Sequence, residues 1–168
     1  MGLFDRAGMP AEEYRGLSAT LPGRRARVLA WGRGEDGPVV GLQDRLALRS
    51  ADGWRFVPWH HIETGRWDSE TSSLRWTQTD GRAEAVTLAE PGALPDLFRE
   101  RVAASILVQH RFDAGPGRSA VIVARRALSD TAEPLIWSVS TSGRRWDDAD
   151  RESLAAELAR IKAEYDII

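Results

Sequence analysis

Residues 51–81, ADGWRFVPWHHIETGRWDSETSSLRWTQTDG, decide the fold, because four of the seven tryptophans of the chain fall within them between two Asp-Gly pairs. Asp-Gly between alternating residues is a strong hairpin signal, since glycine accepts the positive φ that a tight turn between twisted strands requires. This stretch is therefore predicted to form an antiparallel β-meander.

The strand pattern continues on both sides of the meander. Residues 45–49 alternate, with Leu46 and Leu48 on one face, which is the period of a half-buried strand. Pro58 has no N–H to donate to a ladder, so its strand is predicted to lie at an edge or to break at a bulge. The whole series predicts seven short strands, at residues 24–31, 39–43, 45–49, 54–59, 62–68, 74–78 and 82–88.

Two amphipathic helices are predicted after these strands. Pro95 suits a first helical turn, and an apolar stripe recurs at three- and four-residue spacing over Leu94, Leu97, Phe98, Val102 and Ile106. Residues 118–128 and 135–141 then predict two further strands. Asp147, with Asp150 three positions on, has the pattern of a capping box at the start of a final helix. The inward face of that helix is predicted to consist of Leu154, Leu158, Ile161 and Tyr165.

The first 23 residues contain scattered glycines and prolines and are predicted to form an irregular arm. Two interpretations remain open for this arm. It is either disordered, or it docks on the domain or on a neighbour through Leu3 and Phe4, or through Tyr14 and Leu17.

Seven antiparallel strands followed by one amphipathic helix is the order of the pleckstrin-homology-like (PH-like) fold. The segment VPWHHIETGRWD, residues 57–68, resembles the stretch that introduces the fifth strand of bacterial PH-like and GRAM-type domains, and ALPDLFRERVAASIL, residues 93–107, is similar to their closing helix. Residues 109–168 resemble the C-terminal extension of an actinobacterial family of PH-like proteins. The expected fold is therefore α+β: an N-terminal arm (1–23), a seven-stranded antiparallel PH-like barrel or sandwich closed by a helix (24–108), and a β-hairpin with a C-terminal helix (109–168).

The resemblance implies a binding role, since PH-like domains mostly bind peptides, partner proteins or phosphoinositide head groups. Lipid-binding members use basic residues around the first turn. Here Glu35 and Asp36 lie at the tip of that turn and the second strand has no basic residue, so phosphoinositide binding is not favoured.

The sequence shows no catalytic, cofactor-binding or metal-binding pattern. The chain has no cysteine, which excludes thiolate metal sites and a cysteine nucleophile. Gly32, Gly34 and Gly37 match GxGxxG, but a strand follows them rather than the helix that a dinucleotide loop opens, so we interpret them as a turn. His60 and His61, as adjacent strand residues, would point to opposite faces and could not readily share an ion.

Charge and hydropathy give further limits on partners. The net charge is −2, which does not favour general nucleic-acid binding, and no apolar run approaches the ~20 residues of a membrane span. The amino-terminal residues also lack the apolar core of a signal peptide. We therefore expect a cytoplasmic protein without specific nucleic-acid affinity.

The candidate interaction surface combines aromatic and basic residues. Both faces of residues 54–59 are apolar, and an antiparallel sheet normally leaves one face wet, so the second face requires cover. That cover is predicted to come from residues 109–168 or from a partner. The candidate residues are Trp59, Trp67, Arg125, Arg126, Arg144 and Arg145. Two interpretations of the arginine pairs remain open: they are solvated and paired with the acidic final helix, or they form a surface for an anionic partner or nucleic acid.

The function most consistent with these features is a non-enzymatic PH-like interaction module that binds a protein partner or associates with itself. The alternative is a protein that binds a small ligand or a lipid head group at the barrel mouth or at the arginine-rich hairpin. No cofactor is expected for either.

Overall fold

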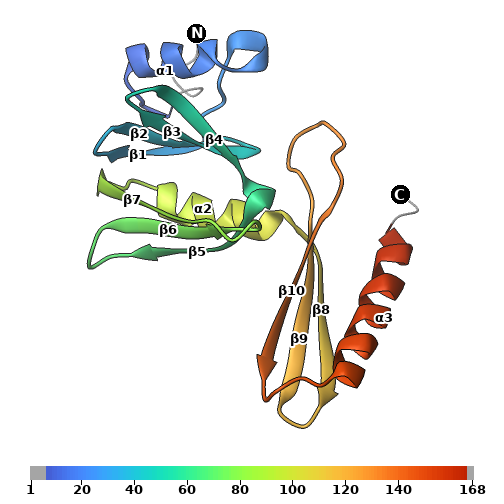
Figure 1. Ribbon diagram of the computed structural model, residues 1–168. Helices are drawn as coiled ribbons and strands as arrows, with labels where there is room; N and C mark the ends of the chain where they lie inside the picture. The colour runs from blue at the N-terminus through green and yellow to red at the C-terminus, as the bar shows by residue number, and fades with distance from the viewer. Residues whose placement is uncertain (1–6, 166–168) are drawn as a thin grey trace. The chain divides into compact units, whose positions relative to one another are not determined.

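The computed structural model describes residues 7–165, apart from the side chain of Arg24. The chain divides into two compact units (Figure 1). The first comprises the residues up to Ser105 together with Arg126–Pro134, and the second comprises Ile106–Arg125 and the residues from Leu135 onward. Both helices and antiparallel strands are present, which confirms the α+β class.

The first unit is built on one curled antiparallel sheet of seven strands, a half-barrel, in the order β4-β3-β2-β1-β7-β6-β5. Its strands are β1 (Ala30–Gly34), β2 (Gly37–Gly41), β3 (Arg45–Ser50), β4 (Gly53–Pro58), β5 (Ile62–Asp68), β6 (Ser73–Gln78) and β7 (Ala83–Glu90). The number of strands and their antiparallel pairing agree with the prediction. The predicted meander over residues 51–81 is wrong, however, because β4 and β5 lie at opposite edges of the sheet and do not pair with each other. Both Asp-Gly turns form as expected, with positive φ at Gly53 (124°) and Gly81 (87°).

The inner face of this sheet packs on helix α2 (Leu94–Ala104). Trp59 and Phe98 meet edge to face there, with ring centroids 5.6 Å apart. Gly65 of β5 makes this contact possible, because a β-carbon at that position would overlap the Phe98 ring. The buried cluster consists of Val39, Leu46, Leu48, Val57, Trp59, Ile62, Leu74, Trp76, Leu88, Leu94 and Phe98.

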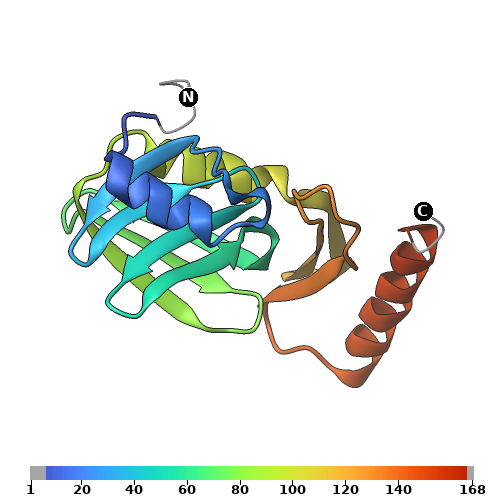
Figure 2. The same ribbon diagram turned by 90° about the horizontal axis from the view of Figure 1, so that it is seen from above.

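The outer face of β1–β4 is covered by the segment that precedes β1, contrary to our expectation that residues 109–168 or a partner would cover it. Helix α1 (Ala11–Ala19) and the short 3₁₀ turn Pro22–Arg24 lie in this segment, so it is not an irregular arm. Figures 1 and 2 show α1 lying across the strands. The cluster beneath it contains Met9, Tyr14, Leu17, Ala26, Val28, Val40, Leu42 and Ala47.

Hydrogen bonds, in addition to apolar contacts, hold this N-terminal segment on the sheet. The Tyr14 hydroxyl donates to the carbonyl of Ala26 at 3.0 Å, and the Ala26 amide donates to the Ser18 hydroxyl at 3.0 Å. Of the interpretations left open for this segment, docking through Tyr14 and Leu17 is the one observed, with Leu17 fully buried. Leu3 and Phe4, the other candidates, lie outside the described residues.

The second unit is a three-stranded antiparallel sheet with one helix packed on it. Its strands are β8 (Ile106–Gly115), β9 (Arg118–Arg125) and β10 (Ile136–Gly143), in the order β10-β9-β8, followed by α3 (Asp148–Tyr165). We expected two strands here and a helix that reached Ile106. Instead α2 ends at Ala104 and Ile106 opens β8, because Val108, His110 and Phe112 alternate at strand spacing and pair with β9.

Helix α3 begins and packs as the sequence predicts. The Asp150 amide donates to Oδ1 of Asp147 at 2.8 Å, and the Asp147 amide donates to Oδ2 of Asp150 at 3.1 Å, which completes the capping box. His110 on β8 lies 2.9 Å from Glu157 on α3. The apolar residues of this interface are Val108, Ile122, Ala124, Leu135, Trp137, Leu154, Leu158, Ile161 and Tyr165.

The connection between β9 and β10, Arg126–Pro134, folds as part of the first unit. The Arg126 amide donates to the carbonyl of Ser105 at 2.8 Å, and Leu128 packs against the half-barrel core. Within residues 7–165, no helix is long and apolar enough to cross a membrane.

Candidate functional site

A groove of about 510 Å³ runs between β10 and α3 in the second unit. We call it the β10–α3 groove. Ile122 of β9 is fully buried against α3, and Val139 lies directly opposite Ile122 on β10, so Val139 is on the helix-facing side of the sheet. The groove is lined by Val139, Thr141, Gly143, Arg144, Arg145, Trp146, Arg151, Leu154, Ala155 and Leu158.

The floor of the groove is apolar and partly open to solvent. Val139 is 37% exposed, which is high for a large apolar side chain, and Leu154 and Leu158 are half-buried. Trp146 closes one end, where its ring lies 6.5 Å from Phe112 and its N–H donates to the carbonyl of Ser142 at 3.4 Å. An exposed apolar strip of this kind is a feature of binding surfaces.

Three arginines give the rim of the groove a positive charge. Arg144 and Arg145 are exposed, and among residues 7–165 no carboxylate lies within ion-pair distance of either guanidinium. Arg151 pairs with Asp148 at 3.2 Å, but both side chains are mostly in solvent, so this pair adds little stability. The Arg144 amide donates to the carbonyl of Gly117 at 3.0 Å, which fixes the backbone that presents both side chains.

One wall of the groove is an edge strand, because among the residues that the structure describes β10 pairs only with β9. The eight residue pairs between them run without a register shift, and the β10 sequence IWSVSTSG has no charge and no proline. The opposite edge, β8, carries Arg111 and Asp113 and has two register irregularities against β9. Charges and bulges protect an edge from strand addition, so β8 is protected and β10 is not.

The six sequence-predicted residues are divided between the two units, and Trp59 and Arg125 are buried. Arg144 and Arg145 lie together at the groove, and Arg126 is exposed at the start of the connecting segment. Trp67 is half-buried against the half-barrel core. Arg125 is 4% exposed at the end of the central strand β9, so it cannot contribute to a surface.

The prediction that Trp59 belongs to an interaction surface is also wrong, because its side chain is fully buried. It does not continue β4 but begins a 3₁₀ turn, Trp59–His61, directly after Pro58. The turn directs the indole into the half-barrel, where its N–H donates to the carbonyl of Leu42 at 3.0 Å. The groove residues Val139, Leu154 and Leu158 were not predicted as a site, although the uncharged run of β10 beside Arg144 and Arg145 was visible in the sequence.

The histidine pair also differs from its predicted geometry. His60 and His61 lie in the same 3₁₀ turn, with ring centroids 4.5 Å apart, rather than on opposite faces of a strand. His60 is buried, and its Nε2 lies 3.2 Å from Glu133. Burial, reinforced by His61, lowers the pKa of His60 below its usual value despite the nearby carboxylate. Within the described chain, no three histidine or carboxylate side chains are grouped to hold a metal ion.

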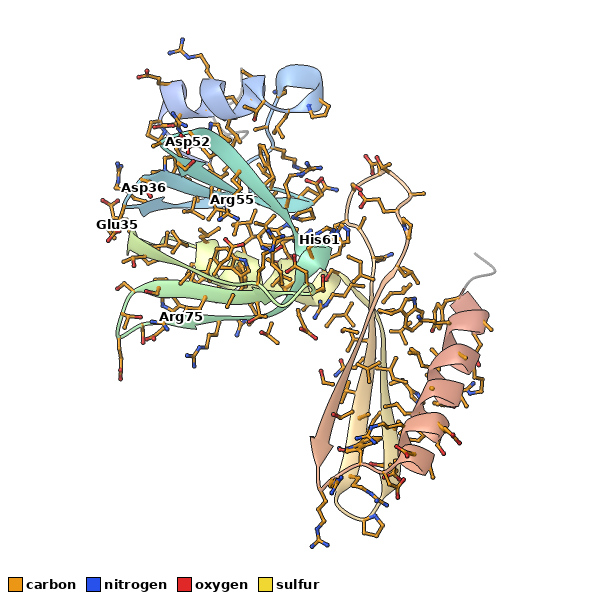
Figure 3. All side chains as sticks on the ribbon, in the orientation of Figure 1. Glu35, Asp36, Asp52, Arg55, His61 and Arg75 are labelled. Carbon is orange, nitrogen blue, oxygen red and sulfur yellow. The ribbon has the colours of Figure 1, made fainter. Side chains whose placement is uncertain are left out.

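The mouth of the half-barrel is polar and carries both signs of charge. Glu35 and Asp36 lie at the β1–β2 turn, near Asp52 of the β3–β4 turn (Figure 3). Arg55 of β4 reaches across to Glu84 of β7 at 2.6 Å. A cavity of about 260 Å³ lies among these elements. The two carboxylates at the turn disfavour an anionic head group there.

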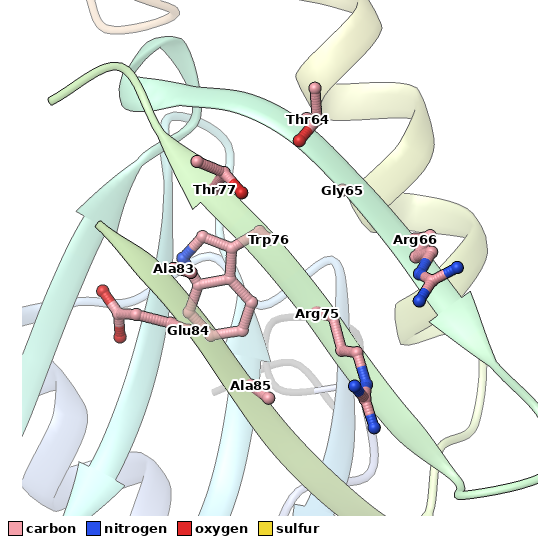
Figure 4. Close-up of a pocket in the computed structure, with 9 residues that line it drawn as sticks. All are labelled: Thr64, Gly65, Arg66, Arg75, Trp76, Thr77, Ala83, Glu84 and Ala85. Atoms are coloured by element: carbon pink, nitrogen blue, oxygen red, sulfur yellow. The ribbon is translucent and has the colours of Figure 1, made fainter. Parts of the chain in front are cut away.

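A third hollow, of about 470 Å³, lies on β5, β6 and β7 (Figure 4). Arg66 and Arg75 are exposed there and lie directly opposite one another on adjacent strands. Like charges in that position repel, so an anion would relieve the contact. Both guanidinium groups are in solvent, however, and the neighbouring Thr64, Thr77, Ala83 and Ala85 do not enclose a ligand.

Comparison with known proteins adds no family assignment. No family model matches the chain, and searches of curated proteins and of solved structures found no significant similarity.

Proposed function

We propose that the protein is a non-enzymatic interaction module that binds a protein partner through the β10–α3 groove. The observation that supports the proposal is the combination, in one groove, of the exposed Val139, of Arg144 and Arg145 without an ion-pair partner among residues 7–165, and of β10 as an edge strand of the described sheet. The seven antiparallel strands followed by α2 are consistent with a PH-like domain as the first unit, and PH-like domains mostly bind.

A macromolecular partner suits this groove better than a small ligand. The groove is an open channel rather than an enclosed cavity, and its floor is apolar with charges only at the rim. Small-molecule sites usually bury most of the ligand surface, whereas protein interfaces place an apolar centre inside a polar rim.

Variant-dependent capture tests the proposal. The full chain, a Val139→Glu variant and a Leu107→Glu variant are immobilised, and proteins retained from a lysate of the source organism are compared by mass spectrometry. Leu107, 39% exposed on β8, is the matched control for Val139. We expect a protein that the full chain and Leu107→Glu retain and Val139→Glu loses. Equal retention by all three would contradict the proposal.

Light scattering on the purified full chain separates a partner from self-association. If the captured protein is the chain itself, the mass in solution will exceed that of a monomer, and Val139→Glu will restore the monomer. If the chain is a monomer at all concentrations, the protein that occupies the groove is a different one.

The second candidate is a small anionic ligand at the same rim, because Arg144, Arg145 and Arg151 lie within one groove. A ligand that binds only the folded state raises the melting temperature. A thermal-shift screen of phosphorylated and carboxylated metabolites would then show a shift in the full chain and none in an Arg144→Glu/Arg145→Glu variant.

A further inference from the structure

We infer that the occupant of the β10–α3 groove is an extended, acidic segment of another protein, which adds to β10 as a fourth strand of the second unit's sheet. The inference rests on the proposed function and specifies the partner's chemistry and its mode of binding.

The backbone of β10 offers the hydrogen bonds for strand addition. Every second residue of an edge strand turns its N–H and C=O away from the sheet, and within the described chain β10 has only β9 beside it. Its eight pairs with β9 run without a bulge, so the outer edge is regular over the length of the strand. Main-chain bonds of this kind give affinity in strand addition, and alternate side chains give specificity.

The side chains that flank this edge define what the added strand carries. Alternate residues of a strand beside β10 would lie on the same face of the sheet as Val139, at the open side of the groove. An aliphatic or β-branched side chain fits there, since opposite side chains on neighbouring strands lie about 5 Å apart. At the Gly143 end of β10 the segment would meet Arg144, Arg145 and Arg151, which select for Asp or Glu.

A second copy of this chain fits the same edge less well. Pairing of β10 with β10 of another copy would bring an uncharged strand to the arginines. Glu133, the acidic residue nearest to β10 in the sequence, already lies 3.2 Å from His60. The rim charge therefore favours a different, acidic chain.

Fluorescence anisotropy with a synthetic peptide tests strand addition. The probe alternates valine and threonine between Asp-Glu ends. One control peptide replaces the acidic ends with lysine, and another carries N-methyl groups on every second residue, which removes the amides of one edge but keeps the side chains. Two N-methylated forms, one for each edge, cover either orientation. All are measured with the full chain.

We expect the acidic probe to bind with a dissociation constant below about 1 mM, and the lysine probe to bind roughly tenfold more weakly. One of the two N-methylated forms should also bind roughly tenfold more weakly. The Arg144→Glu/Arg145→Glu variant should reverse the preference between acidic and basic probes, whereas Arg99→Glu, a change at an exposed position on α2, should not. Hydrogen exchange should slow at β10 amides on binding.

Two results would overturn strand addition. One is the absence of binding by the acidic probe, and the other is equal binding by both N-methylated forms. Either result leaves the capture experiment with Val139→Glu intact, so a failure of the binding mode is distinguishable from a failure of the groove as an interaction site.

Discussion

Trp59 lies at the centre of the half-barrel, where it combines an apolar contact with one directed hydrogen bond. Its ring meets Phe98, and its N–H satisfies the carbonyl of Leu42. A buried carbonyl that loses its donor costs more free energy than the hydrogen bond contributes when both partners are present. The residue therefore specifies the position of the turn after β4 as well as filling the core.

Replacing Trp59 with Phe should lower the free energy of unfolding by about 2 kcal/mol, because the Leu42 carbonyl loses its partner and a small void is left. Urea denaturation followed by circular dichroism measures the change. Trp67→Phe is the matched control, since Trp67 is only half-buried, and it should cost less than about 1 kcal/mol. Equal costs for the two variants would show that Trp59 has no special structural role.

The buried imidazole of His60 predicts a pH dependence. Because burial lowers its pKa in the folded state, the unfolded chain binds the proton more readily. The stability that neutral His60 contributes is then complete above the unfolded value, about 6.5, and is lost as the pH falls through the folded value. Proton NMR titration should give a midpoint for His60 below 6.5.

His61→Gln provides the control for this titration. It removes the neighbouring ring that helps to lower the pKa of His60, so the midpoint should rise while staying below the usual value, since burial is the larger cause. A midpoint above 6.5 in the wild-type protein would mean that Glu133 outweighs burial.

Single residues were predictable from sequence where the interaction is local. The Asp-Gly turns and the Asp147–Asp150 box formed as predicted, because each depends on a few neighbouring residues. The burial of Trp59 and Arg125 was not predictable in the same way. It depends on a 3₁₀ turn after Pro58 and on strands at both sides of β9, which are tertiary features.

At the scale of the elements, the position of α1 changes the interpretation of the apolar outer face of β1–β4. That face supports Tyr14 and Leu17 rather than a partner. The sequence signal for two apolar faces was correct, but it did not identify the segment that covers the second face, because the spacing of apolar residues in residues 1–23 gave no strong helical pattern.

Leu17→Ala should lower the free energy of unfolding by roughly 2–4 kcal/mol, since Leu17 is fully buried on the side of α1 that faces the sheet. Arg15→Ala on the exposed side of the same helix is the control and should change it by less than about 0.5 kcal/mol. Thermal melting of the two variants side by side measures the difference. A small effect of Leu17→Ala would mean that α1 is held only loosely on the sheet.

The edge strands of the second unit show which part of the candidate site could not be predicted from the sequence. Arg144 and Arg145 were selected as candidates from their charge alone. Their neighbours Val139 and Leu154 gained a role only from the order β10-β9-β8, which leaves β10 at an edge beside α3. Strand order is set by long-range pairing, and nothing in the local sequence of residues 118–143 fixes it.

At the scale of the whole molecule, the predicted boundaries of the PH-like domain, residues 24–108, omit two segments that complete the first unit. Residues 7–23 cover the outer face of β1–β4, and Arg126–Pro134 supplies Leu128 to the core and Glu133 to His60. The unit is therefore discontinuous in sequence.

An isolated fragment of residues 24–108 should not fold cooperatively, because Val40, Ala47 and Phe56 would lose their apolar cover. We expect the fragment to bind the dye ANS and to unfold without a sharp transition. The full chain, in contrast, is expected to bind no ANS and to unfold in one sharp transition. A monomeric fragment with a cooperative transition would show that the two omitted segments are dispensable.

Photo-crosslinking tests most directly whether the β10–α3 groove binds a protein. A benzoyl-phenylalanine residue is placed at position 139 or, as the control, at position 107, two positions with similar exposure in the same unit. In cells of the source organism, we predict that irradiation gives a discrete adduct with another protein from position 139 and not from position 107, and that Arg144→Glu/Arg145→Glu abolishes it. The same adducts from both positions, or none from position 139, would contradict a protein-binding role for the groove.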